Sequence, residues 1–226
     1  MPSTDINRVY RLLFDAYGPQ GWWPGDTPFE VCAGAILTQQ TSWGNVERAL
    51  ASLKKNGLLS CNSISNMPLP ELENYLFPTG FYRQKSQRLR NFCQHLQNEY
   101  GCQEKILLSK PLQDARGELL SLKGIGKETA DSMLLYAGEH PVFVVDAYTF
   151  RILSRLEGKE YNDYDMVQNT FHRMLERDLE VYREYHALIV EHAKNSCTKT
   201  APMCSKCPLS NICKESTVSH IRGGTS

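Results

Sequence analysis

The chain has 226 residues, of which 41% are hydrophobic, and its 25 lysines and arginines are balanced by 25 aspartates and glutamates. This length is sufficient for one large domain or two closely packed lobes, and the zero net charge means that nucleic-acid binding would have to rest on local patches. Charges at Asp5, Arg8, Arg11 and Asp15 exclude a signal pattern over the first helix, and no apolar run is long enough to span a membrane. We therefore expect an intracellular, cytoplasmic protein.

Helices are predicted along most of the chain, because apolar residues recur at spacings of three and four. This periodicity predicts helices over residues 6–17, 29–37, 46–53, 86–100 and 166–176. Glycine and proline interrupt it at 18–28, 66–70, 78–80 and 139–141, which leaves the short connections of a compact all-α protein. Alternating strand patterns are nearly absent. The apolar run 142–145 is predicted to be a buried lead-in to a helix that starts near Ala147.

A glycine-containing turn, LKGIGK at residues 122–127, separates a helix that ends near Ser121 from one that runs over 127–137. Gly124 and Gly126 permit a tight turn. The amide N–H groups of such a turn, together with the N-terminus of the following helix, can hold a backbone phosphate. Turns of this kind also merely connect helices, so both interpretations stay open for the motif alone.

Asp146 follows the apolar run directly and has two interpretations. Aspartate is a favoured N-cap, and a helix is predicted to begin after it. A carboxylate at the edge of an apolar segment, near a turn that binds phosphate, is also suitably placed to face a flipped nucleotide. There it would stabilise an oxocarbenium-like sugar, or orient or activate the attacking water.

The eight cysteines form two groups. Four are scattered, namely Cys32, Cys61, Cys93 and Cys102, and four crowd near the end of the chain, namely Cys197, Cys204, Cys207 and Cys213. This asymmetry favours a reducing compartment and a metal site. Structural zinc usually draws its ligands as two close pairs, and the crowded group contains one such pair. A [4Fe–4S] cluster tolerates the irregular spacing and is favoured over zinc, with disulfides third.

The segment 122–130, the pair Val145-Asp146 and the spacing of the crowded cysteines resemble the endonuclease III superfamily of helix-hairpin-helix DNA glycosylases, over almost the whole chain. This resemblance implies a base-excision repair enzyme that binds double-stranded DNA containing a damaged base, and we expect it to act as a monomer. It implies that Asp146 is catalytic and that the last four cysteines hold the cluster. It also implies that Gly124 and Gly126, with Lys127 beside them, build the DNA-binding hairpin. Gln39 or Gln40 would fill the gap left by the flipped base, although both would also suit a polar helix end.

Position 128 departs from the bifunctional members, which carry a lysine there that attacks the sugar. Glu128 occupies it here. Lys127 is adjacent, but one helical step rotates a side chain by about 100°, so its amine should not reach the same point. The sequence therefore predicts a monofunctional glycosylase that uses water and has no AP-lyase activity.

Several further segments resemble the 3-methyladenine glycosylases of this superfamily: residues 22–24, Trp43, GFYRQK at 80–85 and GKETAD at 126–131. The resemblance implies that Trp23 and Trp43 sandwich the base and that Glu128 lines the same pocket. Aromatic faces attract a cationic alkylated purine by stacking and cation–π interaction, but each tryptophan would also suit core packing. Alkylpurine members need not carry the cysteine loop, so this chain combines features of two subgroups.

We expect two helical lobes with the flipped base in a cleft between them. A multi-helix barrel containing the hairpin would span 22–138. The second lobe would combine 1–21 with 139–215 and carry the cluster loop, and 216–226 would form a disordered tail. Three functions stay open: an alkylpurine glycosylase, a pyrimidine or mismatch glycosylase acting on uracil or thymine, and a non-catalytic DNA-lesion binder.

Overall fold

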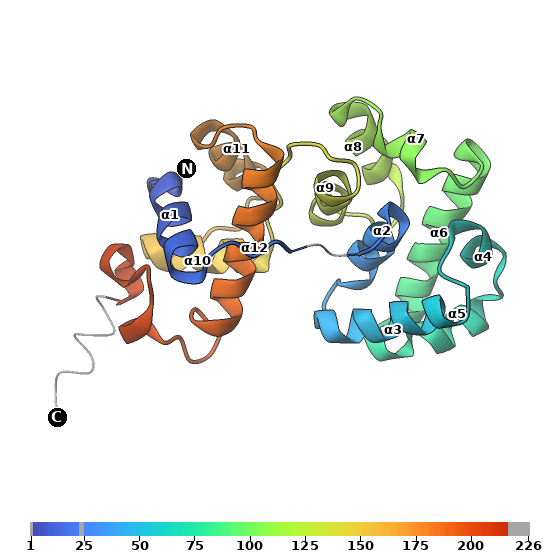
Figure 1. Ribbon diagram of the computed structural model, residues 1–226, viewed down its shortest axis with the longest axis horizontal. Coiled ribbons are helices and arrows are strands. Elements are labelled where there is room, and N and C mark those ends of the chain that lie inside the picture. The colour runs from blue at the N-terminus through green and yellow to red at the C-terminus, as the bar shows by residue number, and fades with distance from the viewer. Residues whose placement is uncertain (1, 23–24, 217–226) are drawn as a thin grey trace. The chain divides into compact units, whose positions relative to one another are not determined.

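The computed structural model describes residues 2–22 and 25–216, and every regular element in these ranges is a helix (Figure 1). The prediction of an all-α fold is confirmed. No helix in the described ranges is long and apolar enough to cross a membrane. The described residues form two compact units: the first joins those up to Trp22 with those from Pro141 onward, and the second ends at His140.

The second unit is built around an apolar helix, α2 (Pro28–Leu37), which packs against α3 (Trp43–Lys55), α6 (Tyr82–Tyr100) and α9 (Lys127–Tyr136). A helix that is apolar on all sides belongs in a core, and seven of the ten residues of α2 are buried. Thr27 caps its start by accepting a hydrogen bond from the Glu30 N–H, and Pro28 occupies the first turn.

Shorter helices complete the second unit: α4 (Cys61–Asn66), α5 (Leu69–Leu76), the 3-10 turn η1 (Phe77–Thr79), α7 (Glu104–Leu108) and α8 (Leu112–Ser121). Helices of five to eight residues are too short to show apolar periodicity, which is why α4, α5 and α7 escaped prediction. Helix α6 begins four residues before its predicted start because its first turn is largely polar, and α3 begins three residues before its predicted start, at Trp43.

The first unit contains α1 (Ile6–Tyr17), α10 (Ala147–Glu157), α11 (Tyr164–Met174) and α12 (Leu179–Asn195), and α12 packs against both α1 and α10 (Figure 1). Its core contains the stacked rings of Phe143 and Phe171, whose centroids lie 3.9 Å apart. The predicted buried lead-in is confirmed, since residues 142–145 are buried and outside any regular element and α10 begins at Ala147. The 3-10 turns η2 (Cys204–Lys206) and η3 (Ser210–Ile212) follow α12.

Two of the scattered cysteines form a disulfide that composition did not predict. Cys61, the first residue of α4, is bonded to Cys102, which follows α6, with a Cα–Cα distance of 5.5 Å. Cys32 and Cys93 are free thiols in the same unit, and burial raises the pKa of each. The disulfide therefore fixes α4 against the end of α6.

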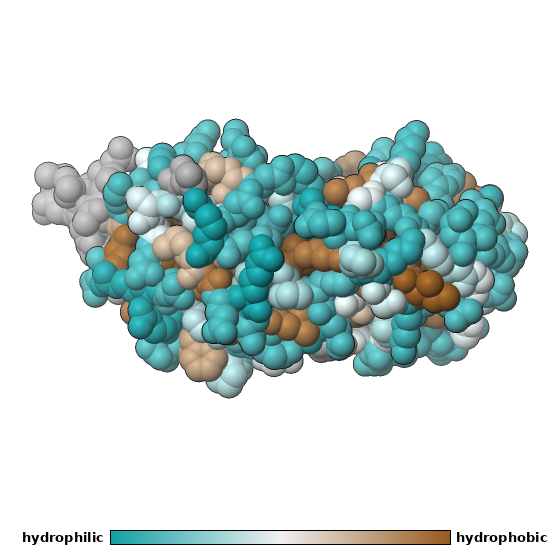
Figure 2. All heavy atoms as spheres, turned by 90° about the horizontal axis from the view of Figure 1, so that it is seen from above, coloured by the Kyte–Doolittle hydropathy of each residue, from teal (hydrophilic) through white to brown (hydrophobic). Residues whose placement is uncertain are grey.

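The surface is mainly hydrophilic on the face shown in Figure 2, with apolar groups between polar and charged side chains. Phe77 and Phe81, which precede α6, are exceptions in the second unit, with 65% and 61% of their surface exposed. Ser216, the first residue of the tail that was predicted to be disordered, is helical and buried. The rest of that tail lies outside the described residues.

Candidate functional site

The turn between α8 and α9 is a tight hairpin that requires glycine at one position. Gly124 has φ 95°, and a Cβ atom there would lie 2.5 Å from the Arg88 side chain. The Ile125 N–H donates to the Leu122 carbonyl at 3.0 Å, and the buried Ile125 side chain anchors the turn. Gly126 is the N-cap of α9, in an extended conformation that does not itself require glycine.

The side chains of Gln39 and Arg88 contact this turn at Gly124. We call these two side chains the hairpin brace. The Gln39 amide donates to the Gly124 carbonyl at 3.1 Å and to the Thr129 hydroxyl at 3.0 Å. Arg88 donates to the Gln39 side-chain carbonyl and fills the space beside Gly124. The brace therefore links the ends of α2 and α9 to α6.

A buried ion pair joins the two helices of the hairpin. Arg116 of α8 donates from Nε and Nη2 to the two carboxylate oxygens of Asp131 on α9, at 2.6 and 3.0 Å. Asp131 is completely buried. Two parallel charge-assisted bonds fix orientation as well as distance, so this pair sets the geometry of the hairpin.

The structure separates the two candidate glutamines. Gln39 is half-buried and bonded within the hairpin brace, whereas Gln40 is exposed and has a left-handed backbone with φ 55°. Lys127 and Glu128, in the first turn of α9, are both exposed. The hairpin thus presents its second glycine and two charged side chains to solvent.

The predicted base pocket is only partly described. Trp43 begins α3 and is half-buried, with its ring tip over Gly34 of α2 at 3.3 Å from the position of an added Cβ atom. Trp23 lies outside the described residues. Trp22 belongs to the first unit, where its ring packs on that of His186 at a centroid distance of 6.0 Å.

Asp146 is the N-cap of α10 and uses one carboxylate oxygen for this purpose. Its Oδ1 accepts hydrogen bonds from the Thr149 N–H at 2.7 Å and from the Thr149 hydroxyl at 2.8 Å. The Asp146 N–H donates in turn to the Thr149 hydroxyl oxygen at 3.4 Å, which completes a capping box. Its Oδ2 lies 3.6 Å from Nε2 of His186, on α12. The interpretation of Asp146 as an N-cap is therefore confirmed. The cap uses Oδ1, and Oδ2 lies near His186 instead.

Burial would raise the pKa of the Asp146 carboxyl, but His186 and the hydrogen bonds from Thr149 outweigh it and hold that pKa below its ordinary value. Asp146 is therefore ionised at neutral pH, although only 12% of its side chain is exposed. A buried carboxylate that keeps its charge is suited to stabilise a positive centre.

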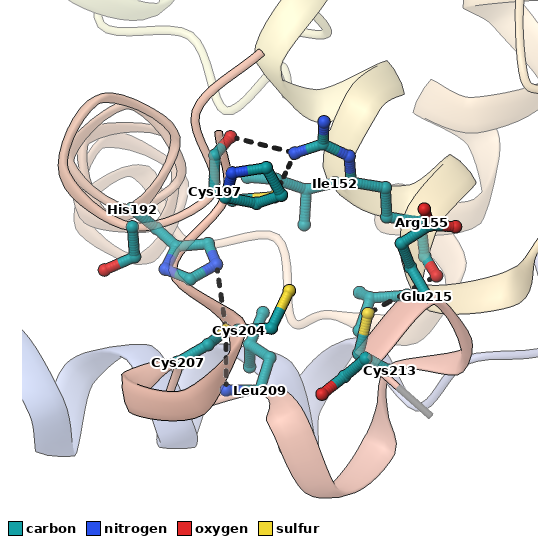
Figure 3. A pocket seen from close by; sticks show the side chains of 13 residues that line it. Ile152, Arg155, His192, Cys197, Cys204, Cys207, Leu209, Cys213 and Glu215 are labelled. Carbon is teal, nitrogen blue, oxygen red and sulfur yellow. Dashed lines mark hydrogen bonds between the residues drawn. The ribbon is translucent and has the colours of Figure 1, made fainter. Parts of the chain in front are cut away.

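The four crowded cysteines line one pocket in the first unit, which we call the cysteine pocket. Figure 3 shows them around this space, with Arg155 on one side and His192 on the other. Arg155 donates to the Cys197 sulfur at 3.1 Å, and the Leu209 N–H donates to the Cys207 sulfur at 3.4 Å. The remaining wall is partly apolar and includes Ile152, Leu156 and Leu209.

This donor set fits an iron–sulfur cluster. Burial raises the pKa of Cys207 to about 11, and the neighbouring Cys197, Cys213 and Cys204 act in the same direction. Crowded thiols lose their protons when a metal centre supplies positive charge. Among residues 2–22 and 25–216, no three histidine, cysteine or carboxylate side chains are grouped so as to hold a single metal ion. A cluster binds one thiolate at each of four irons, so its ligands surround a volume and need not meet at one point.

Sequence reasoning missed the residues that position these groups. His186, Arg88 and Arg155 each lie on a helix far along the chain from the group they contact. Arg155 and Arg151, both on α10, donate to the Cys197 carbonyl, so the helix that Asp146 caps also holds the start of the cysteine loop. The feature that could have pointed to His186 is that a polar residue stands at a buried position of α12.

The sequence matches the model of a known protein family over more than half of the chain. Residues 33–177 match the family model described as "HhH-GPD superfamily base excision DNA repair protein", and the chain belongs to this superfamily of DNA glycosylases. The predicted relationship to the endonuclease III superfamily is confirmed.

Individual relatives cover nearly the whole chain. A protein of Methanocaldococcus jannaschii, provisionally named a DNA repair glycosylase, is 48% identical over 210 residues, which are 92% of this chain and 95% of the relative. The crystal structure of a 3-methyladenine DNA glycosylase (MagIII) of Helicobacter pylori, bound to 1,N6-ethenoadenine, is 29% identical, with a TM-score of 0.74 over 84% of this chain and 98% of that one. An endonuclease III–DNA complex has a TM-score of 0.82 over 97% and 99% of the two chains, and at 23% identity it shows the fold alone.

Proposed function

We propose that the protein is a monofunctional DNA N-glycosylase that removes an alkylated purine such as 3-methyladenine from double-stranded DNA. The observation that carries this proposal is Asp146, a buried and ionised carboxylate with one oxygen fixed by a helix cap and the other outside it. Such a group can face a developing positive charge without moving.

In the proposed reaction, the bond between C1′ and the base nitrogen breaks and its electron pair leaves with the base. The Asp146 carboxylate stabilises the resulting oxocarbenium-like sugar. A water oxygen then forms the new bond to C1′, and its proton passes to Asp146. The products are a free base and an abasic site in an uncut strand.

The absence of strand cleavage is proposed from position 128. A lyase needs an amine that attacks the sugar, and Glu128 offers a carboxylate in the first turn of α9. Lys127 precedes it and points about 100° away around the helix. Borohydride treatment during turnover is therefore expected to trap no covalent enzyme–DNA adduct, and a trapped adduct would contradict the monofunctional assignment.

The hairpin is proposed to hold the DNA backbone. Gly124 and Gly126 shape the turn, the N-terminus of α9 favours a phosphate, and the exposed Lys127 adds a positive charge. Gln40 is proposed to fill the gap left by the flipped base, because its side chain is exposed while that of Gln39 is committed to the hairpin brace. Base flipping leaves such a gap in the stack.

The substrate class is proposed from the aromatic residues Trp23 and Trp43, with Glu128 at the edge of the same pocket. An alkylated purine is cationic and electron-poor, so an aromatic face binds it by stacking and cation–π attraction. Trp43 supports this role because it is half-buried, with its ring tip fixed over Gly34. The 29% identity to a 3-methyladenine glycosylase also supports it.

A [4Fe–4S] cluster is proposed for the cysteine pocket, with Cys197, Cys204, Cys207 and Cys213 as ligands. When bound, it supplies the positive charge that keeps the four sulfurs ionised and fixes the loop after α12. Iron and acid-labile sulfide analysis of the purified protein, with its visible absorption, tests this assignment. Four irons per chain are expected, and one zinc per chain would contradict the cluster.

One assay separates the substrate classes. Release of free base is measured from a duplex alkylated with dimethyl sulfate and from matched duplexes containing uracil, a G·T mismatch or an oxidised pyrimidine. We expect release of alkylated purines, whereas release of thymine or uracil alone would indicate the mismatch class.

The variant Asp146→Asn distinguishes a glycosylase from a non-catalytic DNA-lesion binder. It should lower the rate of base release by roughly 10²- to 10⁴-fold, because the charge that stabilises the sugar is lost, while DNA affinity is retained. A variant that releases base at the wild-type rate would contradict the proposed function.

A further inference from the structure

The second carboxylate oxygen of Asp146 faces the side chain of His186, which comes from a different helix. Nε2 of His186 lies 3.6 Å from Oδ2, and both side chains are largely buried, with 8% and 12% of their surface exposed. Helix α12 carries His186 and packs against α10, which carries Asp146 at its cap. The pair is therefore set by helix packing within the first unit.

The Asp146 carboxylate would turn more freely without this neighbour, since both bonds from Thr149 reach the same oxygen. The imidazole is itself restrained by the ring of Trp22 packed on it. A separation of 3.6 Å is within ion-pair range and slightly long for a direct hydrogen bond. Hydrogen bonds of catalytic groups are often long before the substrate binds and shorten in the reacting complex.

We propose that His186 is a positioning residue that orients Asp146 for base release by holding the carboxylate oxygen outside the α10 cap. This inference rests on the proposed function, because it assigns His186 a role in the reaction of Asp146. The imidazole touches neither base nor sugar in this role. Its N–H fixes the direction of the carboxylate, and an error of about 1 Å in such a group costs roughly 100-fold in rate.

Two variants of similar size isolate the N–H donor. His186→Gln keeps an N–H near the position of Nε2, and His186→Leu fills the space without one. Single-turnover base release is measured on the dimethyl sulfate-treated duplex and on a G·T mismatch duplex, with DNA affinity and thermal unfolding in parallel. We expect the Leu variant to be roughly 10- to 100-fold slower and the Gln variant to stay within roughly threefold of wild type, with equal DNA affinities.

His172→Leu is the matched control. His172 accepts the Phe143 N–H at 2.9 Å in the same unit, so this variant reports loss of a part-buried contact that is not with Asp146. It should lose stability and keep its rate. Equal rates for the Gln and Leu variants of His186, whether fast or slow, would overturn the positioning role. If wild-type protein releases no base from either duplex, or Asp146→Asn is fully active, the proposed function fails, which is a different result.

Discussion

The two units hold Asp131 and Asp146, one buried aspartate each, in different ways. In the second unit, Asp131 is paired with Arg116 through two direct bonds, and the buried Lys85 ammonium donates to the Thr79 carbonyl at 2.7 Å. In the first unit, Asp146 gives one oxygen to a cap and keeps the other at 3.6 Å from an imidazole. Both oxygens of Asp131 are therefore fixed by direct bonds within the hairpin, whereas only one oxygen of Asp146 is fixed by its cap. Substitutions in the two units should thus differ in what they change.

The largest effect on stability is expected from Arg116→Ala. It leaves the Asp131 carboxylate buried without its guanidinium, which should lower the free energy of unfolding by about 3–5 kcal/mol and also weaken DNA binding. Urea unfolding and a binding titration measure both quantities. Arg83→Ala is the control, since Arg83 is exposed and its contact with Glu73 is 3.8 Å long. If Arg116→Ala instead slows base release and leaves stability and DNA affinity unchanged, substitutions in the two units would not differ in this way.

Reduction of the Cys61–Cys102 disulfide should have the next largest effect. The bond closes a loop with a sequence separation of 41 residues, and opening it should lower the free energy of unfolding by about 2–4 kcal/mol. Unfolding with and without dithiothreitol measures this difference. In Cys61→Ser, the free energy of unfolding should no longer depend on dithiothreitol. If it depends on dithiothreitol as much as in wild type, the effect comes from the other cysteines.

Glu118 should make stability depend on pH in the acid range. Burial raises the pKa of its carboxyl, but hydrogen bonds from Lys110, Tyr100 and His95 outweigh it and lower that pKa to about 2. Because the pKa is lower in the folded state, the stabilisation is present above about pH 4.5 and is lost as the pH falls towards 2. Glu118→Gln should cost about 1 kcal/mol at neutral pH, since solvent screens the network. The difference from wild type should disappear near pH 2, and a constant difference would count against this origin.

The smallest effect on stability is expected for Gln40→Ala. Its exposed side chain should contribute less than about 0.5 kcal/mol to folding, while base release slows because the gap in the DNA stays unfilled. Gln39→Ala is the comparison, because it removes hydrogen bonds to Gly124 and Thr129 and should cost about 1–2 kcal/mol. Melting temperatures with single-turnover rates separate the two residues. If Gln39→Ala slows base release and Gln40→Ala does not, the residue that fills the gap in the DNA would be Gln39.

Local signals in the sequence identified much of this arrangement. The predicted helix 6–17 coincides with α1, and the hairpin glycines and Asp146 lie at the ends of helices as expected. Helix α12 was not predicted, because residues such as Tyr182, His186 and His192 occupy buried positions where aliphatic side chains are usual. The brace and the Asp146–His186 pair depend on packing between distant helices, which residue spacing does not encode.

Helix α10 connects two parts of the first unit. Asp146 caps its start, and Arg151 and Arg155, one and two turns further on, hold the Cys197 carbonyl. Its 11 residues span about 16 Å. Shortening the gene so that the residues after α12 are lost would uncover Ile152 and Leu156 and release both arginines from their acceptors. The C-terminal end of α10 would then be less restrained, so loss of the last segment should lower the stability of the helix that Asp146 caps.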